Sequence, residues 1–345
     1  MVKLALRSLI LSAVLLASTA LASSGDSEAR DFLIQKVCVD QSGNVLPLDP
    51  YACPAGDTLR SLEPGEALPY HRYDQPLPDD PADRQRHDSY PVRTSDGQEI
   101  VVNPFKYPPF GQYDPKRDGY SITLVRDGWA SSGGTRTQLR GTTFFGAGCR
   151  PYGGWVYFPV SALDGHLIRP GEVQVPIKGD HWEANGEPWP GRCPSDYRTD
   201  TVTNWEPLPA FQFGGIGPTP IKTIDAIRSI HGFVDSPQFF AQGHLEVFYF
   251  TRLYGWTRWE VWVTRDRLQR DPGLIRRAVT ASRRCIGPAE TAYRGVVFER
   301  TACRDWTAVE VVPRPEVPPQ RPVNIPRTAC WPLCDPRRPG STAQP

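Results

Sequence analysis

Residues 244–264 of this chain read HLEVFYFTRLYGWTRWEVWVT, and the fold can be predicted outward from them. Aromatic and β-branched residues fill both halves of the stretch, which is typical of neighbouring β-strands. Between the halves, Gly255 can supply the positive φ that tight hairpin loops need. The sequence therefore predicts an antiparallel hairpin with its loop around residues 253–256.

The length of this loop determines which side chains share a face, because side chains alternate along a strand. A loop of two or four residues places Glu246 and Glu260 on opposite faces. A loop of three residues shifts the pairing by one residue and brings both carboxylates to one face. His244, Arg258 and Trp262 would then lie on that face as well.

If Glu246 and Glu260 share a face, they could act together as a pair of catalytic acids. Glycosidases use two carboxyl groups roughly 5 to 9.5 Å apart, one to protonate the leaving oxygen and one to attack or activate water. Strands about 4.8 Å apart would bring Glu246 and Glu260 within that range, so both are candidate catalytic residues. The hairpin's candidate ligand-binding residues are Arg258, Trp262, His244 and Tyr249. The alternative is that the aromatic side chains form a core and that each Glu beside an Arg forms an ion pair.

A second candidate cluster is Asp180-His181-Trp182-Glu183, between Cys149 and Cys193. Acid, imidazole and indole groups on a loop that is closed by a disulfide could contact a sugar or a cation. We take His181 and Trp182 as candidate ligand-binding residues. The alternative is a solvated loop with one Trp folded back onto the core.

The chain has eight cysteines, an even number that predicts disulfides in an exported protein. Their spacing favours bridges between nearest neighbours in the sequence. The expected pairs are Cys38 with Cys53, Cys149 with Cys193, Cys285 with Cys303, and Cys330 with Cys334. No pair has the CxxC spacing of a zinc site, and the sequence has no nucleotide-binding motif, so we expect no metal and no cofactor.

The N-terminus predicts export. Lys3 and Arg7 precede an apolar run over residues 9–16, and Ala20-Leu21-Ala22 then resembles a signal-peptidase site. Removal of residues 1–22 would leave 37 basic and 38 acidic residues, a net charge of −1 that does not suggest a nucleic-acid partner. We expect an extracytoplasmic protein, periplasmic or secreted, with no membrane-spanning segment after cleavage.

The remaining chain divides by composition into three parts. Residues 23–110 are rich in turns and are expected to form a loop-rich lead-in. Residues 111–310 hold most of the predicted strands, with short helices expected at 223–231 and after Asp271, where Pro272 would occupy the first helical position. Residues 311–345 contain ten Pro and five Arg, so we expect an extended tail.

These patterns predict a mainly β protein, an antiparallel β-sandwich of jelly-roll type with two short helices. Aromatic-rich exported sandwiches often contact carbohydrate, so our first hypothesis is a binding protein for a glycan. The second is a secreted glycan hydrolase or lyase that uses Glu246 and Glu260. The third is a structural or interaction protein of the cell envelope, whose Pro- and Arg-rich tail contacts an anionic component.

Overall fold

The structure of the chain is a computed structural model. It describes residues 24–48, 52–74, 77, 83–93, 99–110, 118–126, 128–132, 144–146, 150–152, 155–164, 167–178, 198–214, 221–233 and 244–319.

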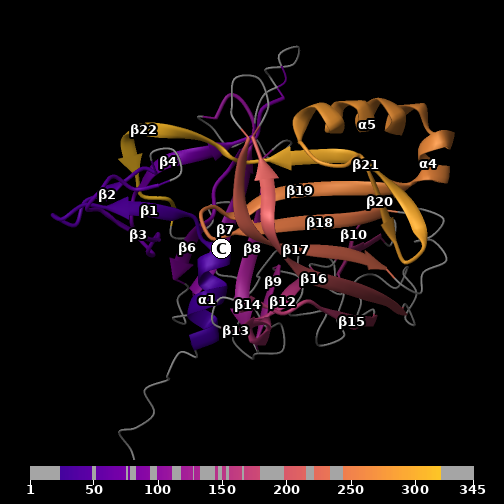
Figure 1. Cartoon of the computed structure of the whole chain (residues 1–345), viewed down its shortest axis with the longest axis horizontal. Coiled ribbons are helices and arrows are strands. Elements are labelled where there is room, and N and C mark those ends of the chain that lie inside the picture. The colour runs from indigo at the N-terminus through magenta and orange to yellow at the C-terminus, as the bar shows by residue number, and fades with distance from the viewer. Residues whose placement is uncertain are drawn as a thin grey trace, which may run out of the picture.

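One large antiparallel sheet has seven strands in the order β15-β16-β17-β18-β19-β21-β20. These strands run across the right half of Figure 1. Except for β19 and β21, strands that are neighbours in the sheet are also neighbours in the sequence, as expected for strands joined by hairpins. The strands are β15 (Gly171–Lys178), β16 (Arg198–Phe213), β17 (Lys222–Phe233), β18 (His244–Thr251), β19 (Gly255–Thr264), β20 (Glu290–Tyr293) and β21 (Val296–Asp305).

An eight-stranded sheet has the order β12-β9-β8-β7-β5-β4-β22, with β6 also paired to β7. Its strands β7 and β8 cross the direction of the seven-stranded sheet in Figure 1, an arrangement of packed sheets. The strands are β4 (Leu68–Tyr73), β5 (Arg86–His87), β6 (Tyr90–Arg93), β7 (Glu99–Lys106), β8 (Gly119–Arg126), β9 (Trp129–Ser132), β12 (Val156–Pro159) and β22 (Ala308–Glu316).

Smaller elements complete the described part of the fold. The short strands are β1 (Lys36–Val39), β2 (Val45–Leu46), β3 (Thr58–Ser61), β10 (Phe144–Gly146), β11 (Arg150–Tyr152), β13 (Leu163–Asp164) and β14 (Leu167–Ile168). The helices are α1 (Ser24–Leu33), α4 (Arg265–Arg270), α5 (Pro272–Arg284) and the 3₁₀ turn η1 (Val160–Ala162). Among the described residues, no helix is both long enough and apolar enough to cross a membrane.

Helix α5 begins where the sequence predicts. The Asp271 side chain accepts hydrogen bonds from the backbone N–H groups of Gly273 and Leu274, and Pro272 occupies the first turn. This arrangement satisfies backbone donors that have no partner within the helix. The helix expected after Asp271 is therefore confirmed.

The helix predicted at 223–231 is wrong, because these residues belong to strand β17. Ile224, Ile227 and Ile230 have helical spacing, but their branched side chains also suit a strand. β17 lies between β16 and β18 and is hydrogen-bonded to both. Pairing with two partners, which local periodicity does not report, determines the conformation of this segment.

The eight-stranded sheet draws on all three parts into which composition divides the chain. The range 23–110, expected to be loop-rich, contains α1 and strands β1 to β7. β7 pairs with β8 across residue 110, and β22, which continues past residue 310, pairs with β4. A strand near the end of the described chain thus completes a sheet whose other strands lie between residues 68 and 159.

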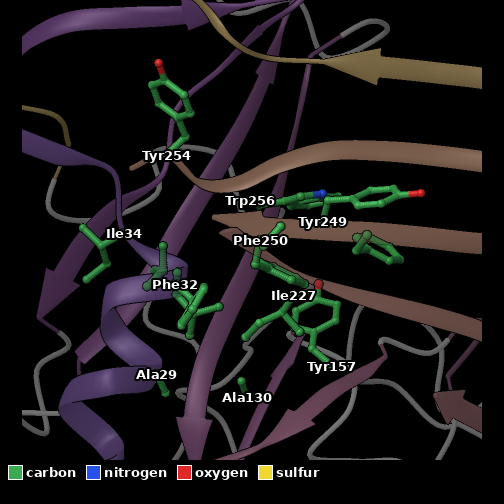
Figure 2. Packing of buried hydrophobic residues seen from close by; sticks show 14 of the residues in the cluster. Ala29, Phe32, Ile34, Ala130, Tyr157, Ile227, Tyr249, Phe250, Tyr254 and Trp256 are labelled. Atoms are coloured by element: carbon green, nitrogen blue, oxygen red, sulfur yellow. The ribbon is translucent and has the colours of Figure 1, made fainter. Parts of the chain in front are cut away.

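The core lies between the two large sheets. Figure 2 shows Phe32 of α1 and Tyr157 of β12 directed toward Ile227 and Phe250 of the seven-stranded sheet. The rings of Tyr157 and Phe250 are 4.8 Å apart. The Ser229 hydroxyl also donates a 2.6 Å hydrogen bond to the Tyr157 carbonyl. The mainly β, antiparallel, sandwich-like fold is confirmed.

Gly255 is predicted to be sensitive to substitution. Its φ is +68°, and an added Cβ would overlap the backbone carbonyl of Leu33 at the end of α1. We expect Gly255→Ala to lower the free energy of unfolding by about 3 kcal/mol, from backbone strain together with this overlap. Chemical denaturation would measure the loss. The matched control is Gly295→Ala, whose φ is +78° with no atom within 4 Å of the added Cβ. Equal losses at the two sites would contradict a role for the contact with Leu33.

Candidate functional site

The 244–264 hairpin combines features of both predicted registers. Thr251 pairs with Gly255, so the loop has three residues. The register then shifts, and Tyr249 pairs with Arg258, which leaves Thr257 as an extra residue in a β-bulge. In the bulge, the Thr257 hydroxyl lies 2.8 Å from the Thr251 hydroxyl and 2.8 Å from the Gly255 carbonyl oxygen.

The bulge reverses the effect of the three-residue loop. Beyond it, Glu246 pairs with Val261 and Val247 pairs with Glu260. Glu246 and Glu260 therefore lie on opposite faces of the sheet. The structure does not bring them together as the paired acids that glycoside hydrolysis needs.

Glu260 lies within a buried network of hydrogen bonds. Its Oε1 accepts from Nη1 of Arg300 at 3.0 Å, and its Oε2 accepts from the Tyr249 hydroxyl at 2.9 Å and from Nε1 of Trp262 at 3.0 Å. The side chains of Glu260 and Arg300 are only 1% and 2% exposed. Burial raises the pKa of Tyr249 well above its usual range, with a further contribution from Glu260, so its hydroxyl remains a donor.

Arg258 extends this network. It donates a 2.5 Å hydrogen bond to Asp305 and a 2.9 Å bond to the backbone oxygen of Gln212, and its guanidinium lies 4.5 Å from the Phe211 ring centre. Burial lowers the pKa of Arg258, but Asp305 and Glu260 outweigh that effect and raise it overall. The predicted residues Tyr249, Arg258, Glu260 and Trp262 thus come together as a buried cluster of ion pairs and aromatic rings.

Glu246 has different surroundings on the other face. Nε1 of Trp155 donates a 2.7 Å hydrogen bond to its Oε2. Trp155 also lies over His231, with ring centres 5.0 Å apart, and His231 pairs directly with Glu246 between β17 and β18. We call the half-buried side chains on this side the Glu246 patch, which consists of Trp155, His244, Glu246 and Trp259.

The Glu246 carboxylate has no cationic partner among the described residues. Burial raises its pKa above the usual value, and the Trp155 hydrogen bond opposes this only in part. Oε1 accepts no hydrogen bond from the part of the chain that the structure describes. Glu260, by contrast, is held by Arg300. A partly buried acid without a compensating charge often marks a functional site.

His231 lies under the patch in a defined tautomer. The Thr203 hydroxyl donates to the Val156 carbonyl at 2.8 Å and therefore accepts from Nδ1 of His231 at 3.0 Å. Nε2 carries no proton in that tautomer, and no described residue donates to it. Burial lowers the pKa of His231 well below its usual value and keeps the ring neutral. The sequence pointed to neither His231 nor Trp155, because both reach Glu246 through pairing and packing of distant segments.

The remaining predicted site residues divide into two groups. His244 lies half-buried at the start of β18, on the same face as Glu246, and its pKa is lowered by burial and by Arg267. The other predicted residues lie outside the described residues: His181, Trp182, Cys149, Cys193, Cys330 and Cys334.

Two predicted disulfides are confirmed. Cys38 is bonded to Cys53 and Cys285 to Cys303, with Cα–Cα distances of 5.4 and 6.2 Å. Bridges of this kind are consistent with a protein of an oxidising compartment outside the cytoplasm. Within the described ranges, no group of three or more His, Cys, Asp or Glu side chains could hold a metal ion.

No known protein family, curated protein or solved structure matches this chain. Its function has to be argued from the chemistry of its own residues.

Proposed function

We propose that this chain is an exported protein that binds a glycan at the Glu246 patch. The observation that supports the proposal is the Glu246 carboxylate, which is half-buried, has no described cationic partner and lies beside an indole. Binding sites commonly combine aromatic surface with a few polar groups that fix the orientation of the ligand. Trp155 and Trp259 supply the aromatic surface, and Glu246 supplies the polar group.

The charge of the patch favours one class of sugar. An ionised carboxylate only accepts hydrogen bonds, so Glu246 suits the hydroxyl or amine donors of a sugar. A sugar that carried its own carboxylate or sulfate would meet like charge in a partly desolvated place. The proposed ligand is therefore a neutral or amine-bearing glycan rather than an acidic one.

The two other hypotheses have less support. A hydrolase or lyase that uses Glu246 with Glu260 would require one shared surface, and the bulge at Thr257 separates the two side chains. The envelope-protein hypothesis depends on residues 311–345, of which 320–345 lie outside the described residues. The role of that tail stays a prediction.

A glycan array probed with the full exported chain tests the proposal. We expect binding to neutral or amine-bearing glycans. Glu246→Gln and Trp259→Ala should each weaken that binding about tenfold or more, since a hydrogen bond to a charged group contributes about 1.5–3 kcal/mol. The matched control is Glu206→Gln, because Glu206 lies in β16 on the Glu260 face and should leave binding unchanged.

Thermal unfolding separates lost binding from lost folding. The raised pKa of Glu246 means that the unfolded chain releases this proton at lower pH than the folded chain, so stability falls as the pH rises through that interval. Glu246→Gln removes this destabilisation and should leave stability at pH 7 unchanged or higher. A stable Gln variant that still binds its glycan with wild-type affinity, or an array without signal, would refute the proposal.

A further inference from the structure

The most deeply buried acids of this fold share one arrangement. In the described part of the chain, four carboxylate residues are at most 3% exposed, and an arginine binds each of them at 2.5 to 3.0 Å. These residues are Asp74, Asp88, Glu260 and Asp305. An arginine offsets the cost of removing a charged group from water. Glu246 departs from this arrangement, because the partner described for its carboxylate is the neutral indole N–H of Trp155.

Positively charged side chains around the Glu246 patch act on other groups. Arg304 of β21 lies on the same face of the sheet as Glu246, but it binds Asp83 at 2.6 Å. Arg267 contributes to the lowered pKa of His244. No described cation lowers the pKa of Glu246, which burial raises. The patch therefore contains a negative group whose counter-charge the described chain does not supply.

The unpartnered atoms of Glu246 and His231 are both acceptors. Trp155 holds Oε2 of Glu246 at 2.7 Å and leaves Oε1 without a described donor. The Trp155 ring also lies over His231, with ring centres 5.0 Å apart. Nε2 of the buried His231 has no described donor either. This pair of residues lacks hydrogen-bond donors as well as positive charge, and a ligand that brings both would meet a carboxylate whose position is fixed before it binds.

We propose that the Glu246 patch recognises the protonated amine of an amino sugar, a cation that takes the place of the missing arginine. The inference rests on the proposed glycan function and narrows the ligand to glycans with a free amine. An ammonium group would bring Oε1 both a hydrogen bond and a counter-charge, whereas a hydroxyl would bring only the hydrogen bond. The indoles of Trp155 and Trp259 favour the same ligand, because the face of an indole attracts a cation.

Asp88 shows what a cation does to a carboxylate in this fold. Asp88 is fully buried, and burial by itself would raise its pKa. Arg86, at 2.8 Å, and His71 reverse this effect and hold the pKa of Asp88 below its usual range. An ammonium group beside Glu246 should act in the same direction. The bound amine would thus keep Glu246 in its charged form, which only accepts hydrogen bonds.

Calorimetric titration of the full exported chain with two matched ligands tests the inference. The ligands are oligomers of glucosamine and of N-acetylglucosamine with the same linkage and length, at a pH at which the free amine carries its proton. We expect the glucosamine oligomer to bind about tenfold more tightly, since a hydrogen bond between charged groups is stronger than one between neutral groups by about that factor. Glu246→Gln should remove most of this preference, because it removes the charge and retains the shape.

Glu206→Gln is the matched control, because it removes the same charge from the opposite face of the sheet and should leave the preference unchanged. Equal affinity for the two oligomers would overturn the inference and leave glycan binding at the patch standing. A preference that persists in Glu246→Gln would also overturn it, since another part of the chain would then bind the amine. If neither oligomer binds while neutral glycans bind on the array, the inference alone fails, and an array without signal refutes both proposals.

Discussion

Glu260→Ala is expected to lower the free energy of unfolding by about 3–5 kcal/mol, the typical loss when one partner of a buried ion pair is removed. The substitution would leave the guanidinium of Arg300 buried with only the Cys285 carbonyl, at 2.8 Å, as a described acceptor. The Tyr249 hydroxyl and the Trp262 indole N–H would also lose their acceptor. Urea unfolding followed by tryptophan fluorescence would measure the loss.

Glu246→Ala is the matched control, because it removes the same side chain from a neighbouring position on the opposite face. The Glu246 carboxylate has one indole donor and no described cationic partner. We therefore expect Glu246→Ala to change the free energy of unfolding by no more than about 1 kcal/mol. A second control is Glu260→Met combined with Arg300→Met, which removes both charges and should restore much of the lost stability. If Glu246→Ala and Glu260→Ala destabilise the chain equally, the contrast between the two carboxylates is wrong.

That contrast shows what the sequence could and could not predict about the site. The alternation of the hairpin, the role of Gly255 and the two possible groupings of side chains all follow from local pattern. Which side chains share a face depends on one extra residue, Thr257. Its hydroxyl is hydrogen-bonded to the Gly255 carbonyl oxygen and to the Thr251 hydroxyl. Many residues tolerate a strand position like that of Thr257, so the sequence alone carries no signal of the bulge.

Partners from distant segments were equally hard to predict. Trp155 lies 91 residues before Glu246 in the chain, yet it supplies the hydrogen bond to that carboxylate. His231 pairs with Glu246 only because residues 222–233 form a strand, whereas the isoleucine spacing predicted a helix. Once β17 is recognised as a strand next to β18, the neighbourhood of His231 and Glu246 follows from the register.

The disulfides were predictable because each confirmed bridge closes a short loop. The cysteines are 15 residues apart in Cys38–Cys53 and 18 apart in Cys285–Cys303. Loops of this length contribute about 3 kcal/mol each by restricting the unfolded chain. We therefore expect the removal of both bridges, by Cys→Ala substitution at all four positions, to lower the free energy of unfolding by about 6 kcal/mol.

The two bridges should differ in how they couple to Glu260. Cys285–Cys303 fixes the segment after α5 whose carbonyls, from Cys285 and Ile286, accept hydrogen bonds from Arg300 and Arg258. Once this bridge is replaced, those carbonyls are held less firmly and Arg300 depends more on Glu260 alone. In a double-mutant cycle, the effects on the free energy of unfolding of Glu260→Ala and of replacing Cys285 and Cys303 should therefore differ from additivity by about 0.5 kcal/mol or more. The effects of Glu260→Ala and of replacing Cys38 and Cys53 should be additive. Simple additivity with both bridges would show that the disulfide and the buried ion pairs stabilise the sheet independently.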